Sequence, residues 1–223
     1  MKSIEGKVVV LGSQGVGKTS IIVQYVGKVF NHHVNPTIGA SFFTCKLNVE
    51  NTRIKLQVWD TAGQERFKAM APMYYRNANA AMLVFDLTQY KTFTAMKEWV
   101  TELRRNVEEA MVLVVIGNKS DLREEREIDT EEGRAYATNI GASYHETSVH
   151  REEGIESVFL AVGAGLLRLA TTGQERESGG SINVGQLRKI PPSGELPLEV
   201  NHRENARVLD TGSTIHDRSH ACC

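Results

Sequence analysis

The residues best suited to chemistry in this chain form a glycine-rich run near its start. The run reads Gly12-Ser13-Gln14-Gly15-Val16-Gly17-Lys18-Thr19-Ser20 and matches the pattern G-x-x-x-x-G-K-[S/T]. Its glycines let the backbone wrap a phosphate, and N–H groups at a helix N-terminus point at the anion. Lys18 would supply charge to the β- and γ-phosphates, and Thr19 a hydroxyl ligand for Mg²⁺. The alternative is a glycine-rich turn without a ligand, and a chance match is expected in about one such chain in a hundred.

A second polar run indicates which base such a nucleotide carries. Asn118-Lys119-Ser120-Asp121 directly follows an apolar run. A carboxylate at Asp121 can accept hydrogen bonds from N1–H and the exocyclic amine of guanine, whereas adenine offers no such donor pair. Taken alone, the run is better explained as a polar turn after a strand, but together with a phosphate loop it favours guanine binding.

A third run, Trp59-Asp60-Thr61-Ala62-Gly63-Gln64-Glu65, closes another predicted strand. Asp60 at a strand end can hold Mg²⁺ directly or through water. Gly63 permits close backbone approach to a γ-phosphate, and Gln64 is suited to orienting an attacking water. The alternative is an ordinary strand followed by a helix cap at Glu65.

The elements that must position these runs alternate between strand and helix. Apolar runs at 8–11, 80–85 and 111–116 predict buried strands. Apolar residues from Phe93 to Leu103 fall at helical spacing, as do those from Ile155 to Leu169. Asp129 and Glu132 predict a capping box for a helix that stops near Gly141. Repeated strand–helix units imply a parallel sheet with helices on both faces.

One segment departs from this alternation. Residues 41–50 and 53–60 both alternate between apolar and polar side chains, with about Asn51-Thr52 between them. This predicts a hairpin, hence one antiparallel edge strand in the sheet. Phe42 and Trp59 are in phase with the polar faces, so we expect both rings outside the core.

Composition limits the function classes. The chain has 223 residues with 26 basic and 27 acidic side chains, so its net charge of −1 gives no electrostatic case for nucleic acid. Uninterrupted apolar runs such as 111–116 are too short to span a membrane. Three cysteines build no disulfide scaffold, which favours a reducing, cytosolic compartment. Residues 171–223 contain no aromatic side chain, so we expect one domain over 1–170 and a flexible tail over 171–223.

Together these runs resemble the Rab family of Ras-like small GTPases over residues 5–170 and the C-terminal end. Besides the three runs, the marks are Asn-Pro-Thr-Ile-Gly at 35–39, Tyr74-Tyr75-Arg76, Glu146-Thr147-Ser148 and Cys222-Cys223. Residues 38–42 and 71–76 look like the early-endosomal branch.

The resemblance implies roles for individual residues. Thr37 would ligate Mg²⁺ and touch the γ-phosphate, ordering 31–41 in the GTP state, and Gly63 would do the same for 61–78. Phe30 would stack against guanine, with Ser148 and the Val149 N–H closing over the base. An aromatic cluster of Phe42, Trp59 and Tyr74 would bind effectors; the alternative is that these rings pack beneath the switch helix.

Two positions depart from the family pattern. Gln14 stands where a small residue is common, close to the γ-phosphate and Gln64, which predicts slow hydrolysis. Val149-His150 replaces Ala-Lys, and because the Val149 N–H survives we expect base binding to persist.

The ending Cys222-Cys223 resembles the double cysteine to which Rabs attach two geranylgeranyl chains. Two lipid chains attach a protein firmly to a membrane, whereas one chain gives only marginal attachment. A soluble carrier would have to shield both chains for the protein to leave the membrane. The alternative is a zinc site of His216, His220 and the two cysteines, which a tail without a core orients poorly. Cys45 lies on an apolar strand face and is expected in the core.

The sequence therefore predicts a P-loop α/β fold with a mostly parallel six-stranded sheet. The resemblance implies a prenylated GTPase switch with Mg²⁺ as cofactor and Lys18, Thr37 and Gln64 in the catalytic machinery. It also implies an exchange factor, an activating protein, effectors, and residence on the cytoplasmic face of intracellular, endosomal membranes with a cytosolic pool. The alternatives are a GTP-bound scaffold with negligible turnover, because of Gln14, and a phosphotransferase on the same loop.

Overall fold

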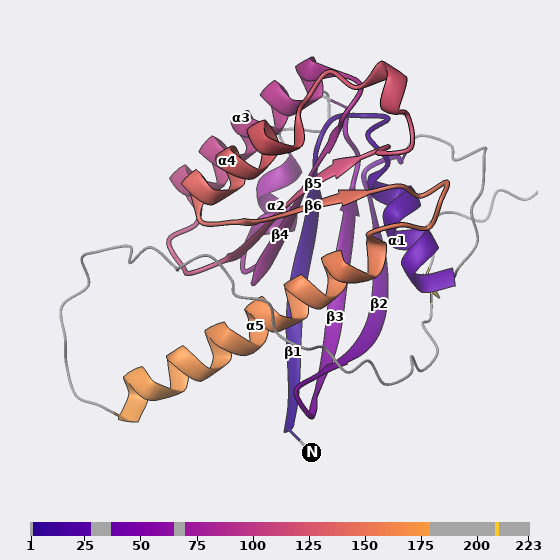
Figure 1. The fold of residues 1–223 in the computed structure, drawn as a ribbon. Coiled ribbons are helices and arrows are strands. Elements are labelled where there is room, and N and C mark those ends of the chain that lie inside the picture. Colours follow the sequence, from indigo (N-terminus) through magenta and orange to yellow (C-terminus); the bar gives the residue numbers. More distant parts are fainter. Residues whose placement is uncertain (1, 28–36, 65–69, 179–207, 210–223) are drawn as a thin grey trace, which may run out of the picture.

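A computed structural model describes residues 2–27, 37–64, 70–178 and 208–209 and is built around one twisted sheet (Figure 1). Its order is β6-β5-β4-β1-β3-β2-β7. All neighbouring pairs from β6 through β3 are parallel, whereas β2 runs antiparallel to β3. The strands are β1 (Lys2–Leu11), β2 (Ala40–Val49), β3 (Thr52–Thr61), β4 (Ala80–Asp86), β5 (Val112–Asn118), β6 (Ser143–Thr147) and the two-residue β7 (Val208–Leu209). The predicted six-stranded, mostly parallel sheet is confirmed, and β7 adds a short antiparallel pairing along β2.

Helices cover both faces of the sheet, as Figure 1 shows. They are α1 (Lys18–Gly27), α2 (Ala71–Tyr75), α3 (Tyr90–Asn106), α4 (Thr130–Ile140), α5 (Ile155–Ser178) and the 3₁₀ turn η2 (Arg123–Glu125). Alternate residues of β1 divide the core between the two faces. Val8 and Val10 pack with α1 and α5, whereas Val9 and Leu11 pack with α2, α3 and α4. All four are fully buried, which explains why this strand reads as a continuous apolar run.

The hairpin between β2 and β3 turns at Glu50 and Asn51, one residue earlier than the sequence suggested. Both residues have positive φ, 47° and 58°, as a two-residue type I′ turn requires. Thr52 already belongs to β3, where it is buried opposite Val49. The hairpin places Phe42 directly opposite Trp59, on the face that carries the polar side chains.

Two details of the helices differ from the predictions. Asp129 is the N-cap of α4, but its side chain makes no capping hydrogen bond, and Glu132 accepts from the Tyr90 hydroxyl instead. The predicted stop holds, since Gly141 ends α4 with φ 73°. Helix α5 continues to Ser178, beyond the boundary expected at 170.

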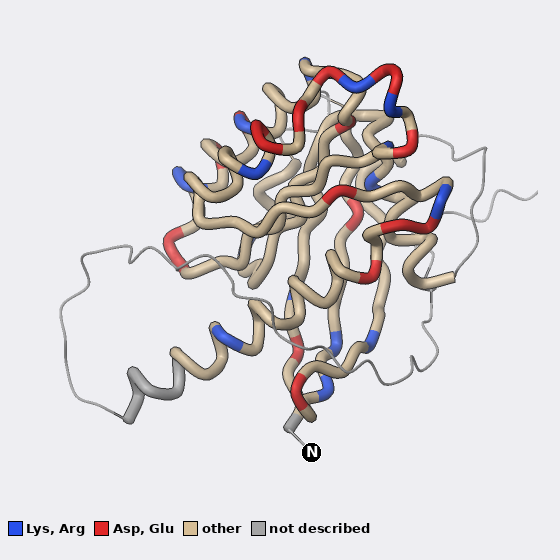
Figure 2. Tube along the Cα trace, in the orientation of Figure 1, with Lys and Arg blue, Asp and Glu red and all other residues tan. Residues whose placement is uncertain are grey.

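Within α5, the segment Ile155–Thr172 has the length and apolar composition that a membrane-spanning helix needs. In this fold it covers the sheet, with Val158, Phe159 and Val162 fully buried in the core. Charged residues of both signs are distributed around the periphery, and the central strands carry few of them (Figure 2). This mixed distribution agrees with the near-zero net charge of the chain.

Candidate nucleotide-binding site

The glycine-rich loop leaves the carboxyl end of β1 and opens α1, in the strand–loop–helix context that phosphate binding requires. The side chain of Lys18 is buried and turns back across the loop. Its Nζ donates to the carbonyl oxygens of Gly12 and Ser13, both at 2.8 Å. Burial lowers the pKa of Lys18 to about 8, while nearby Asp60 opposes that shift. The ammonium is thus held at the centre of the loop, where an anion would stabilise its charge.

Two glycines allow the close approaches around this loop. A Cβ on Gly17, whose φ is 96°, would lie 2.2 Å from Nδ2 of Asn118. A Cβ on Gly63 would lie 2.4 Å from the Gln14 nitrogen and 2.5 Å from Lys18 Nζ. The structure therefore places the start of the segment after β3 against the phosphate loop, and no larger residue fits at either position.

Three oxygen-bearing side chains meet beside Lys18, and they are the three predicted Mg²⁺ ligands. The Thr19 hydroxyl donates to Asp60 Oδ2 at 2.5 Å and lies 3.0 Å from Oγ1 of Thr37. The Thr37 hydroxyl also reaches Asp60 Oδ2, at 3.4 Å. Asp60 is fully buried, and its Oδ1 has no hydrogen-bond partner within the described part of the chain.

These residues fit a magnesium ion. An all-oxygen set with one carboxylate is the donor type that Mg²⁺ prefers, and a buried carboxylate oxygen without a partner is suited to a cation. Burial raises the pKa of Asp60, whereas hydrogen bonds from Thr19 and Thr37 and the charge of Lys18 act in the opposite direction. A bound cation would stabilise the ionised form of this carboxylate.

At the second polar run, the ends of two parallel strands, β5 and β6, are joined to the phosphate loop. Asn118, at the end of β5, donates through Nδ2 to the carbonyl of Val16 in the phosphate loop at 2.9 Å. Its Oδ1 accepts from the hydroxyl of Thr147, at the end of β6, also at 2.9 Å. Asn118 and Thr147 are both buried, so these hydrogen bonds fix the phosphate loop relative to the ends of β5 and β6.

The residues expected around the base lie together at this end of the sheet. The Ser148 hydroxyl donates to Asp121 Oδ1 at 2.6 Å and accepts from the backbone N–H of Arg151. Ser148 and Val149 are buried, whereas His150 is exposed. The arrangement orients the Asp121 carboxylate, which can then accept from paired donors on a purine edge.

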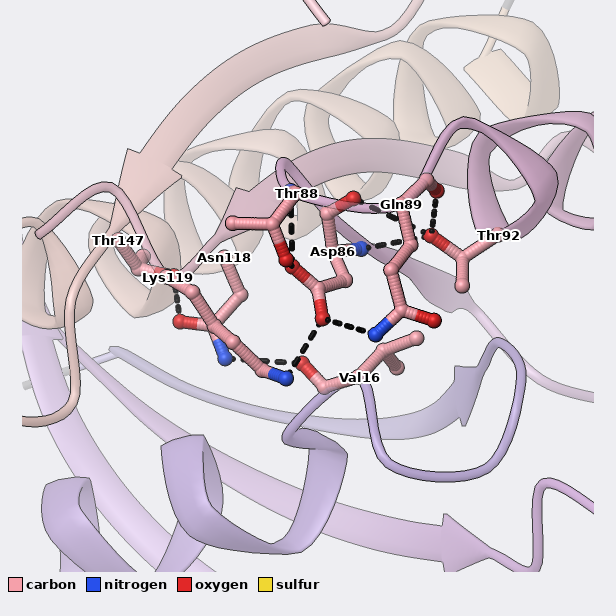
Figure 3. A network of polar contacts seen from close by, with 8 residues as sticks. All are labelled: Val16, Asp86, Thr88, Gln89, Thr92, Asn118, Lys119 and Thr147. Atoms are coloured by element: carbon pink, nitrogen blue, oxygen red, sulfur yellow. Dashed lines mark hydrogen bonds and ion pairs between the residues drawn. The ribbon is translucent and has the colours of Figure 1, made fainter. Parts of the chain in front are cut away.

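Sequence reasoning missed one buried acid in this region. Asp86 ends β4 with no exposed surface, and its Oδ2 forms an ion pair of 2.6 Å with Lys119 (Figure 3). A signal was available, because Asp86 directly follows the apolar run 80–85. A polar residue at the carboxyl end of a central parallel strand lies where such sheets bind ligands.

The predicted aromatic cluster is assembled on the outer side of β2, β3 and α2. The ring centroids of Phe42 and Trp59 are 5.2 Å apart and those of Trp59 and Tyr74 are 6.0 Å apart. All three side chains are half-buried, which matches the phase of the first two along the hairpin. Two large apolar side chains nearby in the sequence are exposed: Ile38, two residues before β2, is 81% exposed, and Met73 on α2 is 70% exposed.

The remaining predicted residues divide into placed and unplaced ones. Gln14 is exposed on the phosphate loop, and Gln64 is half-buried directly after Gly63. Phe30 and the terminal Cys222 and Cys223 lie outside the described residues. The zinc alternative, which needs the same cysteines, also lies outside them. Cys45 is buried in the core, as expected.

Comparison with known proteins gives a consistent picture. Residues 7–168 match the model of the Ras family. The chain is 47% identical over 165 residues to Ras-related protein RabJ of Dictyostelium discoideum, a match that covers 74% of this chain and 64% of RabJ. It is 41% identical over 183 residues to Ras-related protein Rab-21 of Mus musculus, covering 82% of each chain. It is 43% identical over 176 residues to mouse Ras-related protein Rab-22A, covering 79% of this chain and 89% of that protein.

Proposed function

The chain belongs to the Ras family of small GTPases, and from this premise we propose that it is a Rab-like switch. In this proposal it binds GTP and GDP, hydrolyses GTP slowly, and recruits effectors in its GTP form during endosomal traffic. The observation that carries the proposal is the convergence of the phosphate loop, the three oxygen ligands and the Asp121 segment at one edge of the sheet.

The chain's own residues bind and orient the nucleotide. Backbone N–H groups of 13–20 and the Lys18 ammonium hold the α-, β- and γ-phosphates, and Asp121 with Ser148 holds guanine. Thr19, Thr37 and Asp60 hold Mg²⁺, which supplies charge neutralisation to the β- and γ-phosphates when bound. All of these contacts act on groups that GTP and GDP share, apart from those with the γ-phosphate.

The γ-phosphate contacts make the state of the protein depend on hydrolysis. Thr37 lies just before β2, which carries Phe42, and Gly63 lies just after β3, which carries Trp59. Contacts of Thr37 and Gly63 with the γ-phosphate would therefore couple the nucleotide to the aromatic cluster. Gln64 orients the attacking water through its side-chain amide. Gln14 projects from the same loop that Gly63 contacts, and a side chain of this length slows hydrolysis by crowding the water.

Membrane attachment completes the proposed cycle. Geranylgeranyl chains on Cys222 and Cys223 anchor the protein to the cytoplasmic face of endosomal membranes, and a soluble carrier shields both chains in the cytosolic pool. An exchange factor loads GTP, and an activating protein accelerates its hydrolysis. The support for this step is the double-cysteine ending together with the Rab relatives.

The first test is the nucleotide that co-purifies with the recombinant chain, released by denaturation and identified by anion exchange. GDP is the expected result and supports a guanine-specific, hydrolysing switch. GTP as the main species would instead support the scaffold alternative, in which Gln14 makes turnover negligible. An adenine nucleotide, or a purified protein with no affinity for added GDP, would contradict the proposal.

A further inference from the structure

Asp86 is a buried charge that none of the roles above uses. Its Oδ1 accepts two hydrogen bonds from Thr88, one from the backbone N–H at 2.9 Å and one from the hydroxyl at 2.8 Å. Its Oδ2 accepts from Gln89 Nε2 at 3.1 Å and faces the Lys119 ammonium at 2.6 Å (Figure 3). The two carboxylate oxygens therefore have different roles. Oδ1 caps the turn before α3, and Oδ2 pairs with the Lys119 ammonium, which lies just after the neighbouring strand.

Lys119 is in an unusual position to receive that contact. Its φ of 68° lies in the left-handed region, which is strained for a residue other than glycine. It follows Asn118, whose side chain is bonded to the phosphate loop, and precedes the segment that carries Asp121. Such a conformation persists only where the surroundings fix it, and the ion pair with Asp86 anchors the far end of the same side chain.

A capping role alone does not require a full charge here. A neutral side chain with one carbonyl oxygen satisfies both donors of Thr88, whereas a fully buried carboxylate is costly unless a cation pairs with it. The cation, Lys119, directly follows β5, which pairs with β4 in the register that sets Asp86 opposite Asn118. The negative charge of Asp86 is thus paired with the positive charge of Lys119, at the ends of the strands that form the site.

We propose that Asp86 is a positioning residue for guanine-nucleotide retention, acting through Lys119. The pair holds the aliphatic stem of Lys119 between the phosphate loop and the segment of Asp121, where it forms one wall of the base-binding site. This inference rests on the proposed nucleotide-binding function, and it assigns to Asp86 no contact with the nucleotide itself.

The test is a double-mutant cycle on the dissociation rate of a fluorescent GDP analogue from the full-length protein with Mg²⁺ present. Asp86→Asn keeps a carbonyl oxygen for Thr88 but turns an amide donor toward the Lys119 ammonium. We expect release to accelerate at least tenfold. Lys119→Met should accelerate release on its own, and adding Asp86→Asn to it should change the rate by less than twofold, because the residue through which Asp86 acts is already absent.

Thr92→Val is the matched control. The buried Thr92 hydroxyl bonds backbone groups of the same turn, at Asp86 and Gln89, without touching the carboxylate. Thr92→Val should lower the thermal unfolding midpoint, because it removes these local hydrogen bonds. The rate of GDP release should stay within about twofold of the wild type. If Asp86→Asn alone does not fold, the double variant, which contains no unpaired charge, still tests the prediction that its release rate equals that of Lys119→Met.

Three results would overturn the inference. One is a wild-type release rate in Asp86→Asn, and another is slower release, which would mean that Asp86 competes with the nucleotide for Lys119. The third is independent multiplication of the two effects, which would give Asp86 a role that bypasses Lys119. A wild-type protein that fails to bind GDP would contradict the proposed function itself, so the two failures are distinguishable.

Discussion

Replacing Gly63 by Ala should separate GTP hydrolysis from nucleotide binding. The added Cβ would lie 2.4 Å from the Gln14 nitrogen and from the Ser13 carbonyl carbon, against 3.4 Å or more for ordinary contact. Residues 62–64 must therefore retreat from the phosphate loop by about 1 Å. A misplacement of that size costs on the order of a hundredfold in rate, equivalent to about 2.7 kcal/mol of transition-state stabilisation. GDP lacks the γ-phosphate that Gly63 is proposed to contact, so GDP affinity should change by less than about threefold.

The assay is single-turnover hydrolysis of preloaded GTP, run beside equilibrium binding of a fluorescent GDP analogue. Gly27→Ala is the control, because a Cβ at that position meets nothing within 4 Å. A Gly63→Ala protein that hydrolyses GTP at the wild-type rate would show that the close approach to the loop has no catalytic role. An equal loss of hydrolysis and GDP affinity would refute the selectivity for the γ-phosphate.

Three further outcomes are expected. Gln14→Gly should accelerate single-turnover hydrolysis, by about fivefold or more if crowding of the water limits the rate, and an unchanged rate would remove Gln14 as the cause. Asp60→Asn should abolish the slowing of GDP release that added Mg²⁺ gives the wild type, because a neutral amide replaces the one carboxylate of the ligand set; a variant that still responds to Mg²⁺ would contradict this assignment. With Mg²⁺ chelated, the GDP affinity should be constant at pH values below the pKa of Lys18, which is about 8, and should fall about tenfold by pH 9. Above about pH 8 the free protein loses the Lys18 proton, whereas the GDP complex retains it, so binding must take up a proton. Lys18→Met should bind weakly and independently of pH over that range, whereas a wild-type profile in that variant would assign the titration elsewhere.

The sequence predicted the elements of the site because they depend on local patterns. Val8 to Leu11 is apolar on both faces, and a strand buried on both faces requires that. The phases of Phe42 and Trp59 within the hairpin placed both rings off the core side, and period-two alternation determines this without tertiary information.

Choices between side-chain partners were less predictable, because they depend on which elements become neighbours. Glu132 had the spacing for a capping box, yet α3 brought the Tyr90 hydroxyl within 2.7 Å of it. The contact between Asp86 and Lys119 joins residues 33 positions apart in the sequence through strand pairing alone. The end of α5 could not be read from the apolar pattern for a different reason. The fall in apolar residues after 170 marks the end of the core-facing stripe, whereas Gln174 to Glu177 are good helix formers and continue the helix to Ser178.

The buried charges of the site differ in how completely the protein itself satisfies them. The Asp86 carboxylate accepts three hydrogen bonds and an ion pair from protein groups. Burial instead lowers the pKa of Lys18 and raises that of Asp60, so both neutral forms are favoured relative to water. A phosphate bound at Lys18 and a cation bound at Asp60 would reverse both pKa shifts. Burying these two charged groups costs free energy, and the bound ligands offset that cost, which contributes to the affinity for nucleotide and Mg²⁺. That division is suited to a switch, because Asp86 keeps the base end of the site preorganised while the phosphate end responds to its ligand.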